Sequence, residues 1–378
     1  MLAKSMLFGL GVLTVATAAR ADVSVCISVS ATGPASALGS TQQNSVRFLP
    51  PKVADQTLRY TVYDDATDTS LATQNARKCV NDQAADVLIG GSGTPTAAAI
   101  APVAAEAQIP FLSLAPFAAK GDQSKWSFVV PQPMRVMIEA IVGDIKTKGI
   151  KKLGYIGYND SLGDLTLNSL LPLAQAAGIT VSPIERFARN DTSVTAQVLK
   201  IVAENPGAVL VVGSGAPAAG PNLALAERGY SGQIYHTHGS ASPAFLQVAG
   251  ASANGTILPV GPIGIVEQLS DDNPSKIIGA KYKTSYEAVF GAGSISSFGG
   301  YLYDAALIVA TTTPKALEAG KPGTPAFRNA LRTAFENLPG VPGVHGVYAS
   351  TPDNHELADN AKSRVMTRVV GGKLTLLP

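Results

Sequence analysis

The sequence predicts an α/β protein with two doubly wound, parallel-sheet lobes joined by a multi-strand hinge. Three observations support this fold class. Short β-rich runs alternate with Ala-rich helical stretches, the alternation starts again after Pro131 and Pro133, and a helical block returns after the second unit. Continuous apolar runs such as DVLIG at 86–90 are typical of parallel strands covered on both faces. Because helices return after the second unit, we expect the chain to cross between the lobes more than once and to form a hinge with a cleft.

The first unit is expected to alternate five strands with helices. The strands fall at residues 23–28, 58–64, 86–89, 111–114 and 127–130, and the helices include 69–82 and 96–107. The second unit follows the same plan. Its helices include 134–148 and 162–177, and its strands fall at 152–157, 179–187, 208–212, 233–237 and 256–260.

The last part of the chain has a different pattern. Helical spacing covers 273–290, 299–312 and 324–337, with Gly- and Pro-rich turns between them. Two late strands at 365–370 and 373–377 are joined by Gly371-Gly372, which indicates a hairpin. We therefore assign residues 22–132 and 262–362 to an N-lobe, and residues 133–261 and 363–378 to a C-lobe.

The first 21 residues have the pattern of a cleaved secretory signal peptide. Lys4 provides a positive start, an apolar run covers 6–18, and the small-x-small triplet at 19–21 precedes Asp22. The alternative is a membrane anchor, but the apolar run is shorter than the roughly 20 residues that a span needs. We expect a soluble protein of the periplasm.

Charge excludes two classes of partner. Cleavage removes two of the 29 basic residues and none of the 27 acidic ones, so the mature chain of 357 residues is formally neutral. No basic stripe or acidic tail is present. The sequence therefore implies neither a nucleic acid nor an anionic membrane surface as a partner.

The two cysteines, Cys26 and Cys79, allow two interpretations. In an oxidising compartment they can form a disulfide. The alternative is a pair of buried, small apolar side chains. Cys26 lies in the first predicted strand and Cys79 in the 69–82 helix, and the sequence does not show whether the two are adjacent.

The motifs of common enzyme classes are absent. The sequence has no G-x-S-x-G elbow, no H-E-x-x-H, no P-loop, and no G-x-G-x-x-G after a strand. His236 and His238 provide only two donors at a strand end, which makes a poor metal site. We therefore expect a binding protein without catalytic residues, metal or cofactor; a secreted α/β enzyme is the less favoured alternative.

Two loops that follow predicted strands carry the best candidates for ligand contacts. SATGP at 30–34 follows the first strand, and GGSGTP at 90–95 follows the third and precedes an Ala-rich helix. Ligands of parallel α/β sheets bind beyond the carboxyl ends of the strands. The free amides of a helix N-terminus, with the hydroxyls of Ser92 or Thr94, suit a carboxylate. Ordinary turn chemistry is the alternative explanation of these loops.

In combination, the motifs resemble those of the branched-chain amino-acid-binding proteins of bacterial ABC importers, the Leu/Ile/Val-binding family with the type I periplasmic binding fold. The resemblance covers the chain from Val23 to its end. The matching segments are SVSATGPASALG, DVLIGGSGTPTAAAIAPVAAEAQIPFLSLAP, KKLGYIGYNDSLGD, YHTHGSASPAFLQVAG, GTILPVGP and SFGGYLYDAALIV.

The resemblance implies a set of ligand-binding residues. Thr94 is expected to meet a ligand carboxylate with Ser92 beside it, and the stretch from Ala115 to Phe117 is expected to line the cleft. The family's loop aromatics fall on Leu38 and Leu162, and a family tyrosine falls on Gly215 or Ala216. The family's acidic residue, which pairs with the ligand's ammonium, falls on His238. Phe298, at the start of the late helix, completes the set.

These departures from the family pattern favour a ligand other than an amino acid. A buried ammonium needs an anion or dense carbonyls, and His238 is not an anion. Loss of the rim aromatics and gain of Phe117 predict a larger apolar cavity. Such changes are similar to those of the branch of the family that takes aromatic carboxylates, which implies an aromatic acid as the ligand, with His238 donating a hydrogen bond to a phenol or carboxylate. Branched-chain or other amino acids come next as ligands.

The resemblance also implies the biological role. We expect a monomer that closes its lobes on a small carboxylate and delivers it to the permease of an ABC importer. An exported sensor that reports its ligand to a receptor kinase, with the same fold, is the alternative; a subunit of a cytoplasmic amide sensor conflicts with the signal peptide.

The signal peptide makes a direct prediction. Mass spectrometry of protein recovered from the native cell should find Asp22, or a residue within two positions of it, at the N-terminus. Recovery of protein that still carries residues 1–21 would contradict export with cleavage.

Overall fold

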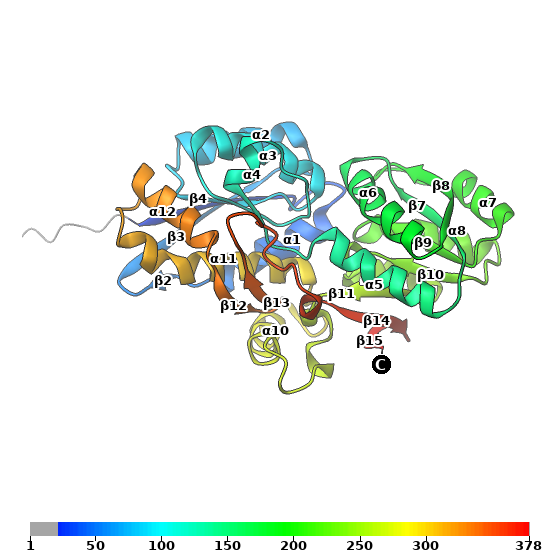
Figure 1. Cartoon of the computed structure of the whole chain (residues 1–378). Coiled ribbons are helices and arrows are strands. Elements are labelled where there is room, and N and C mark those ends of the chain that lie inside the picture. Colours follow the sequence, from blue (N-terminus) through cyan, green and yellow to red (C-terminus); the bar gives the residue numbers. More distant parts are fainter. Residues whose placement is uncertain (1–21, 378) are drawn as a thin grey trace, which may run out of the picture.

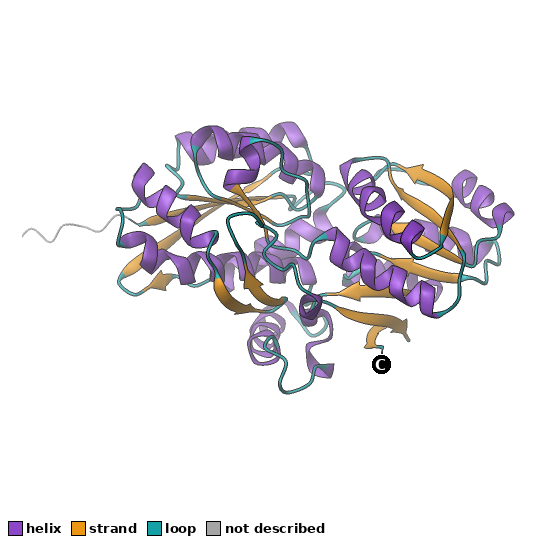
Figure 2. Ribbon diagram, in the orientation of Figure 1, coloured by secondary structure: helices purple, strands orange, loops and turns teal. Residues whose placement is uncertain are grey.

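Two separate β-sheets organise the computed structural model, which describes residues 22–377 (Figure 1). Each sheet has its own helices and forms one lobe (Figure 2), so the two-lobed α/β architecture is as the sequence predicted. The expected signal peptide lies outside the described residues. No helix within residues 22–377 has both the length and the apolar character that a membrane span needs.

The first sheet has the strand order β2-β3-β1-β4-β5-β6, in which all neighbours are parallel except β2 with β3. Its strands are β1 (Val23–Val29), β2 (Lys52–Val53), β3 (Gln56–Asp64), β4 (Val87–Gly90), β5 (Phe111–Ser113) and β6 (Ser127–Val129). The helices between them are α1 (Ser36–Ser45), α2 (Thr69–Asn81), α3 (Thr94–Ala107) and α4 (Asp122–Trp126).

The second sheet has the order β15-β14-β11-β10-β9-β7-β8 and is parallel from β11 to β8. Its strands are β7 (Lys152–Tyr158), β8 (Thr180–Phe187), β9 (Ala208–Val212), β10 (Gln233–His236), β11 (Ile257–Val260), β14 (Val365–Val370) and β15 (Lys373–Leu376). Its helices are α5 (Met134–Thr147), α6 (Ser161–Ala176), α7 (Thr195–Glu204), α8 (Ala219–Glu227) and α9 (Pro243–Ala249). The predicted hairpin at Gly371-Gly372 joins β14 to β15 at this sheet's edge.

The helical block after the second sheet returns to the first lobe. It consists of α10 (Lys276–Phe290), α11 (Ser297–Leu317) and α12 (Pro325–Phe335), followed by a small hairpin of β12 (Pro339–Gly343) and β13 (Gly346–Ala349). Successive side chains of β1 point to opposite faces of the first sheet, so they pack against two different layers of helices. Val25 and Ile27 pack with α11 and α12, whereas Cys26 packs with α2 and α3. These two pairs of helices lie on opposite sides of the first sheet (Figure 1).

Some elements differ from the sequence prediction for identifiable reasons. The helix expected to begin at 96 begins at Thr94, because Gly93 is its N-cap and Pro95 suits the first turn. The strands β12 and β13 were not predicted. The sequence of β12 is PGVPG, and proline and glycine normally argue against a strand.

Three passages connect the lobes, and the buried side chain of Gln132 touches all of them. Gln132 belongs to the first passage, between β6 and α5, and its Nε2 donates to the carbonyl of Ser363 (2.6 Å) in the third. Gly261 belongs to the second passage, where an added Cβ would lie 2.8 Å from Gln132 Nε2 and 1.9 Å from His345 Nδ1. Finally, the hydroxyl of Tyr301 on α11 donates to Gln132 Oε1 (2.7 Å).

Cys26 on β1 and Cys79 on α2 form a disulfide in the structure, and both residues are fully buried. Cys26 faces α2 because it is on the opposite face of β1 from Val25 and Ile27. The bond therefore fastens the first strand of the N-lobe to one of its covering helices.

The disulfide should contribute measurably to stability. The two cysteines are 53 residues apart, and a loop of this size stabilises a protein by about 2–4 kcal/mol through the unfolded chain. The double variant Cys26→Ala/Cys79→Ala should lose this free energy of unfolding in urea titrations. Wild-type protein unfolded under reducing conditions is the control and should lose a similar amount; equal stability of the variant and the oxidised wild type would contradict the prediction.

Candidate functional site

A cavity of about 420 Å³ lies between the two lobes. Residues that follow the carboxyl ends of strands in both sheets form its walls, as expected for parallel α/β sheets. Seven of the nine residues expected from the sequence line it: Leu38, Ser92, Thr94, Ala115, Leu162, His238 and Phe298.

Gly215 does not line the cavity but lies where the lobes meet. It has a left-handed φ of +59°, and an added Cβ would lie 3.2 Å from Ala37 Cβ and 3.2 Å from Leu38 Cδ1. A larger residue at 215 would therefore press on α1 of the other lobe. The structure shows the lobes in direct contact at this point.

Phe117 also lies outside the cavity, contrary to the expectation that it would stack on a ligand ring. Its ring packs against Phe111 (centroids 6.0 Å apart) in the core beneath α3. Pro116, one residue earlier, lines the cavity instead. The physical reason is that an aromatic ring gains more from burial in an apolar core than from a place at a loop surface.

The side-chain hydroxyls of Ser92 and Thr94 already form hydrogen bonds with other groups of the protein. The Ser92 hydroxyl accepts from the amide of Ser30 (2.8 Å) and donates to Gln42 Oε1 (2.5 Å). The Thr94 hydroxyl donates to the carbonyl of Pro116 (2.8 Å). What this loop offers a ligand is therefore the N-terminus of α3, whose first amides have no partner within the helix and whose dipole favours an anion.

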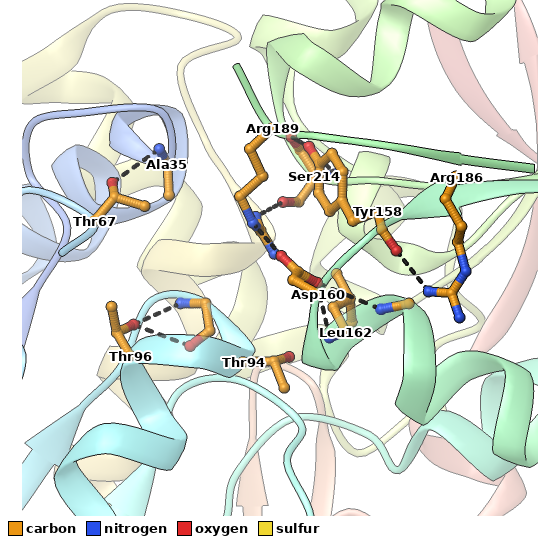
Figure 3. Close-up of polar contacts among 12 residues, drawn as sticks. Ala35, Thr67, Thr94, Thr96, Tyr158, Asp160, Leu162, Arg186, Arg189 and Ser214 are labelled. Carbon is orange, nitrogen blue, oxygen red and sulfur yellow. Dashed lines mark hydrogen bonds and ion pairs between the residues drawn. The ribbon is translucent and has the colours of Figure 1, made fainter. Parts of the chain in front are cut away.

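The sequence analysis missed the charged residue of the cavity, Arg189. Its Nε donates to Asp160 Oδ2 (2.6 Å), and its Nη1 donates to Ser214 Oγ (3.2 Å). The guanidinium lies over the ring of Tyr158, 4.2 Å from the centroid (Figure 3). Its Nη2 is buried and has no hydrogen-bond partner among the described residues. The site therefore holds an unused, charged donor.

The carboxylate of Asp160 interacts with the N-terminus of α6 as well as with Arg189. Asp160 is the N-cap of α6, and its Oδ1 accepts from the amide of Leu162 (2.9 Å). An aspartate in this position is stabilised by the helix dipole. The guanidinium can therefore bind a second anion. A carboxylate is a suitable partner, because its two oxygens can accept hydrogen bonds from the N–H groups of arginine.

A signal for Arg189 was present in the sequence. The residue lies two positions after β8 (Thr180–Phe187), at the carboxyl end of a parallel strand, where the rule that located Ser92 also applies. Its side chain reaches past β7 to Ser214, which follows β9. The distance that it spans cannot be read from the chain order.

His238 lines the cavity as an uncharged side chain. Burial lowers its pKa to about 4, so the imidazole is neutral at pH 7. The cavity lining contains no Asp or Glu, and Arg189 is its only ionised side chain among the described residues. Burial also lowers the pKa of His236 to about 3, and its ring bonds Ser240 and Asn222. Within residues 22–377 no group of three or more His, Cys, Asp or Glu side chains could hold a metal ion.

The rest of the wall is apolar and partly aromatic. Phe298 and Tyr301 enter from α11, with ring centroids 6.3 Å apart in an edge-on arrangement. Leu38, Leu114 and Met134 also line the cavity. The site therefore combines an apolar enclosure with one localised cationic donor.

Comparisons with known proteins cover nearly the whole chain. Residues 22–371 match the family model described as periplasmic binding protein. An extracellular ligand-binding receptor from Rhodopseudomonas palustris is 42% identical, with a TM-score of 0.92 over 94% of this chain and 99% of that one. No match was found among curated protein sequences.

Two more distant structures share the fold. A leucine-binding protein from Thermotoga maritima is 17% identical, with a TM-score of 0.79 over 94% of this chain and 98% of that one. A solute-binding protein of an ABC transporter from Rhodopseudomonas palustris BisB5, in complex with 3,4-dihydroxybenzoic acid, is 18% identical. Its TM-score is 0.79 over 93% of this chain and 95% of that one.

The unpartnered Nη2 of Arg189 predicts that a substitution of this residue lowers the affinity for a carboxylate ligand. Arg189→Gln should weaken binding of a carboxylate ligand about 10- to 150-fold, because a hydrogen bond to a charged group contributes about 1.5–3 kcal/mol. Calorimetry with the tightest acid from a panel of carboxylates would measure it.

Arg186→Gln is the matched control for this variant. Arg186 bonds the carbonyl of Tyr158 and Asp164, extends on the other side of Tyr158 (Figure 3), and does not line the cavity. Its substitution should leave the affinity nearly unchanged. Equal losses for the two variants would contradict the assignment of Arg189.

Proposed function

This chain belongs to the periplasmic binding protein family, and we propose that it binds a small carboxylate that lacks an amino group, preferably an aromatic acid, between its lobes. Delivery to an ABC importer is part of the proposal. It is supported by the family and by the solute-binding protein of an ABC transporter that shares the fold. We further propose that the chain acts as a monomer, with the expected N-lobe and C-lobe as the units that close.

The observation that carries the proposal is the distribution of charge in the cavity. Among residues 22–377, Arg189 provides the only ionised group of the lining, its Nη2 lacks a partner, and no lining residue is acidic. A ligand carboxylate can satisfy that donor. The ammonium of an amino acid would be buried without an anion, which costs several kcal/mol.

The walls support an aromatic acid within this class. Phe298 and Tyr301 present rings to the cavity, and an aromatic pair contributes about 0.5–1.5 kcal/mol beyond the area that it buries. These two residues take the place that the sequence analysis gave to Phe117. The neighbour that binds 3,4-dihydroxybenzoic acid shows that the fold accommodates such a ligand, although its identity of 18% supports the fold alone.

A pair of ligands that differ by one amino group tests the proposal. The mature protein should bind 3-phenylpropanoate, benzoate or cinnamate at least a hundredfold tighter than phenylalanine or leucine, as measured by calorimetry. A hundredfold corresponds to about 2.8 kcal/mol, less than the expected cost of burying an unpaired ammonium. Phenylalanine or leucine binding as tightly as the aromatic acids would refute the ligand class while leaving the family unchanged.

A further inference from the structure

His238 is a buried histidine of the cavity wall with an unpaired ring nitrogen. The residue is 5% exposed and lines the cavity, and its Nδ1 is buried without a partner among the described residues. Both ring nitrogens of His236 have partners. His345 also has an unpaired Nδ1, but its Nε2 donates to the carbonyl of Ser297 (2.8 Å) and the residue does not line the cavity. A buried nitrogen without a hydrogen-bond partner lowers the stability of the folded protein unless a water molecule or a ligand bonds it.

The position of His238 relative to Arg189 brings both within reach of one small molecule. The guanidinium of Arg189 bonds Ser214, which lies two residues beyond β9. His238 lies two residues beyond β10, the neighbouring strand. Adjacent strands are about 4.8 Å apart. The charged donor and the neutral imidazole therefore follow each other along the same wall of the cavity.

The chemistry of a neutral imidazole restricts what it can meet. One ring nitrogen carries a proton and the other a lone pair, so the ring can donate one hydrogen bond and accept one. Because burial keeps His238 uncharged, it does not offer a second cation for a dicarboxylate. A hydroxyl group fits the unpaired Nδ1 in either tautomer, because it can donate to a lone pair or accept from an N–H.

We propose that His238 is a specificity-determining residue that selects ligands carrying a hydroxyl group in addition to the carboxylate held by Arg189. This proposal rests on the proposed function and narrows its ligand class to hydroxylated aromatic acids. The carboxylate provides most of the charge recognition, and the hydroxyl satisfies the imidazole. A ligand without the hydroxyl leaves the buried ring unpaired, and sites built this way discriminate strongly against the analogue that lacks the group.

Matched acids with and without a hydroxyl test the proposal. Calorimetry would compare benzoate with 3- and 4-hydroxybenzoate, and cinnamate with 3- and 4-hydroxycinnamate, using the full mature chain. At least one hydroxylated acid should bind about 5- to 150-fold tighter than its parent, the range expected when a buried polar group is left unmet.

Two variants of His238 make the test specific. His238→Leu should weaken the hydroxylated acid at least fivefold, leave the parent acid unchanged or tighter, and bring their ratio close to one. His238→Gln, which keeps a polar group, should retain part of the preference. The ligand-free melting temperature of His238→Leu should not fall, because the variant removes a buried nitrogen that has no partner.

The outcomes separate this proposal from the function on which it rests. If parent and hydroxylated acids bind wild-type protein equally well, or if His238→Leu weakens both equally, His238 contacts the shared part of the ligand and the proposal is overturned. If no aromatic acid binds while amino acids do, the proposed function fails and the role of His238 fails with it. A preference that is present in the wild type, lost in His238→Leu and partly retained in His238→Gln supports both.

Discussion

The position of one buried side chain, Gln132, underlies the arrangement of the two lobes. It bonds Ser363 and Tyr301 and packs against Gly261, so the three passages between the lobes are held at one point. Holding three passages together sets how the two sheets face each other, and with them the carboxyl ends of their strands. The cavity exists because those two sets of loops meet. Tyr301 belongs to both regions, because the residue lines the cavity and its hydroxyl bonds the hinge glutamine.

Recognition within this frame depends on a few side chains in loops. The family's fold accommodates a leucine-binding protein and a dihydroxybenzoate complex alike, so the ligand class is set by the loops and not by the sheets. In this chain the loop after β8 places Arg189 against the aspartate that caps α6, and the loop after β10 places an uncharged histidine near it. The result, within the part of the chain that the structure describes, is a cavity with a free cationic donor and no acid in its lining.

Much of the fold could be predicted because its patterns are local. Apolar runs placed the parallel strands within a few residues of their observed bounds, and the glycine pair at 371–372 located the last hairpin. The family resemblance is confirmed by the match over residues 22–371. The prediction failed where composition and structure disagree, as in the strand PGVPG, whose pairing with β13 outweighs its poor strand propensity.

The sequence by itself determined the alternation of strands and helices, the likeness to a binding-protein family, and several of the loops that line the cavity. Each of these depends on residues close together in the chain. Only the tertiary structure decided which side chains of those loops face the cavity. Phe117 turned into the core, where its ring gains more from burial, and Arg189 reached across β7 to a partner beyond β9. The pairing of Cys26 with Cys79 was decided in the same way, because the face of β1 on which α2 packs is a property of the packed layers and not of the chain order.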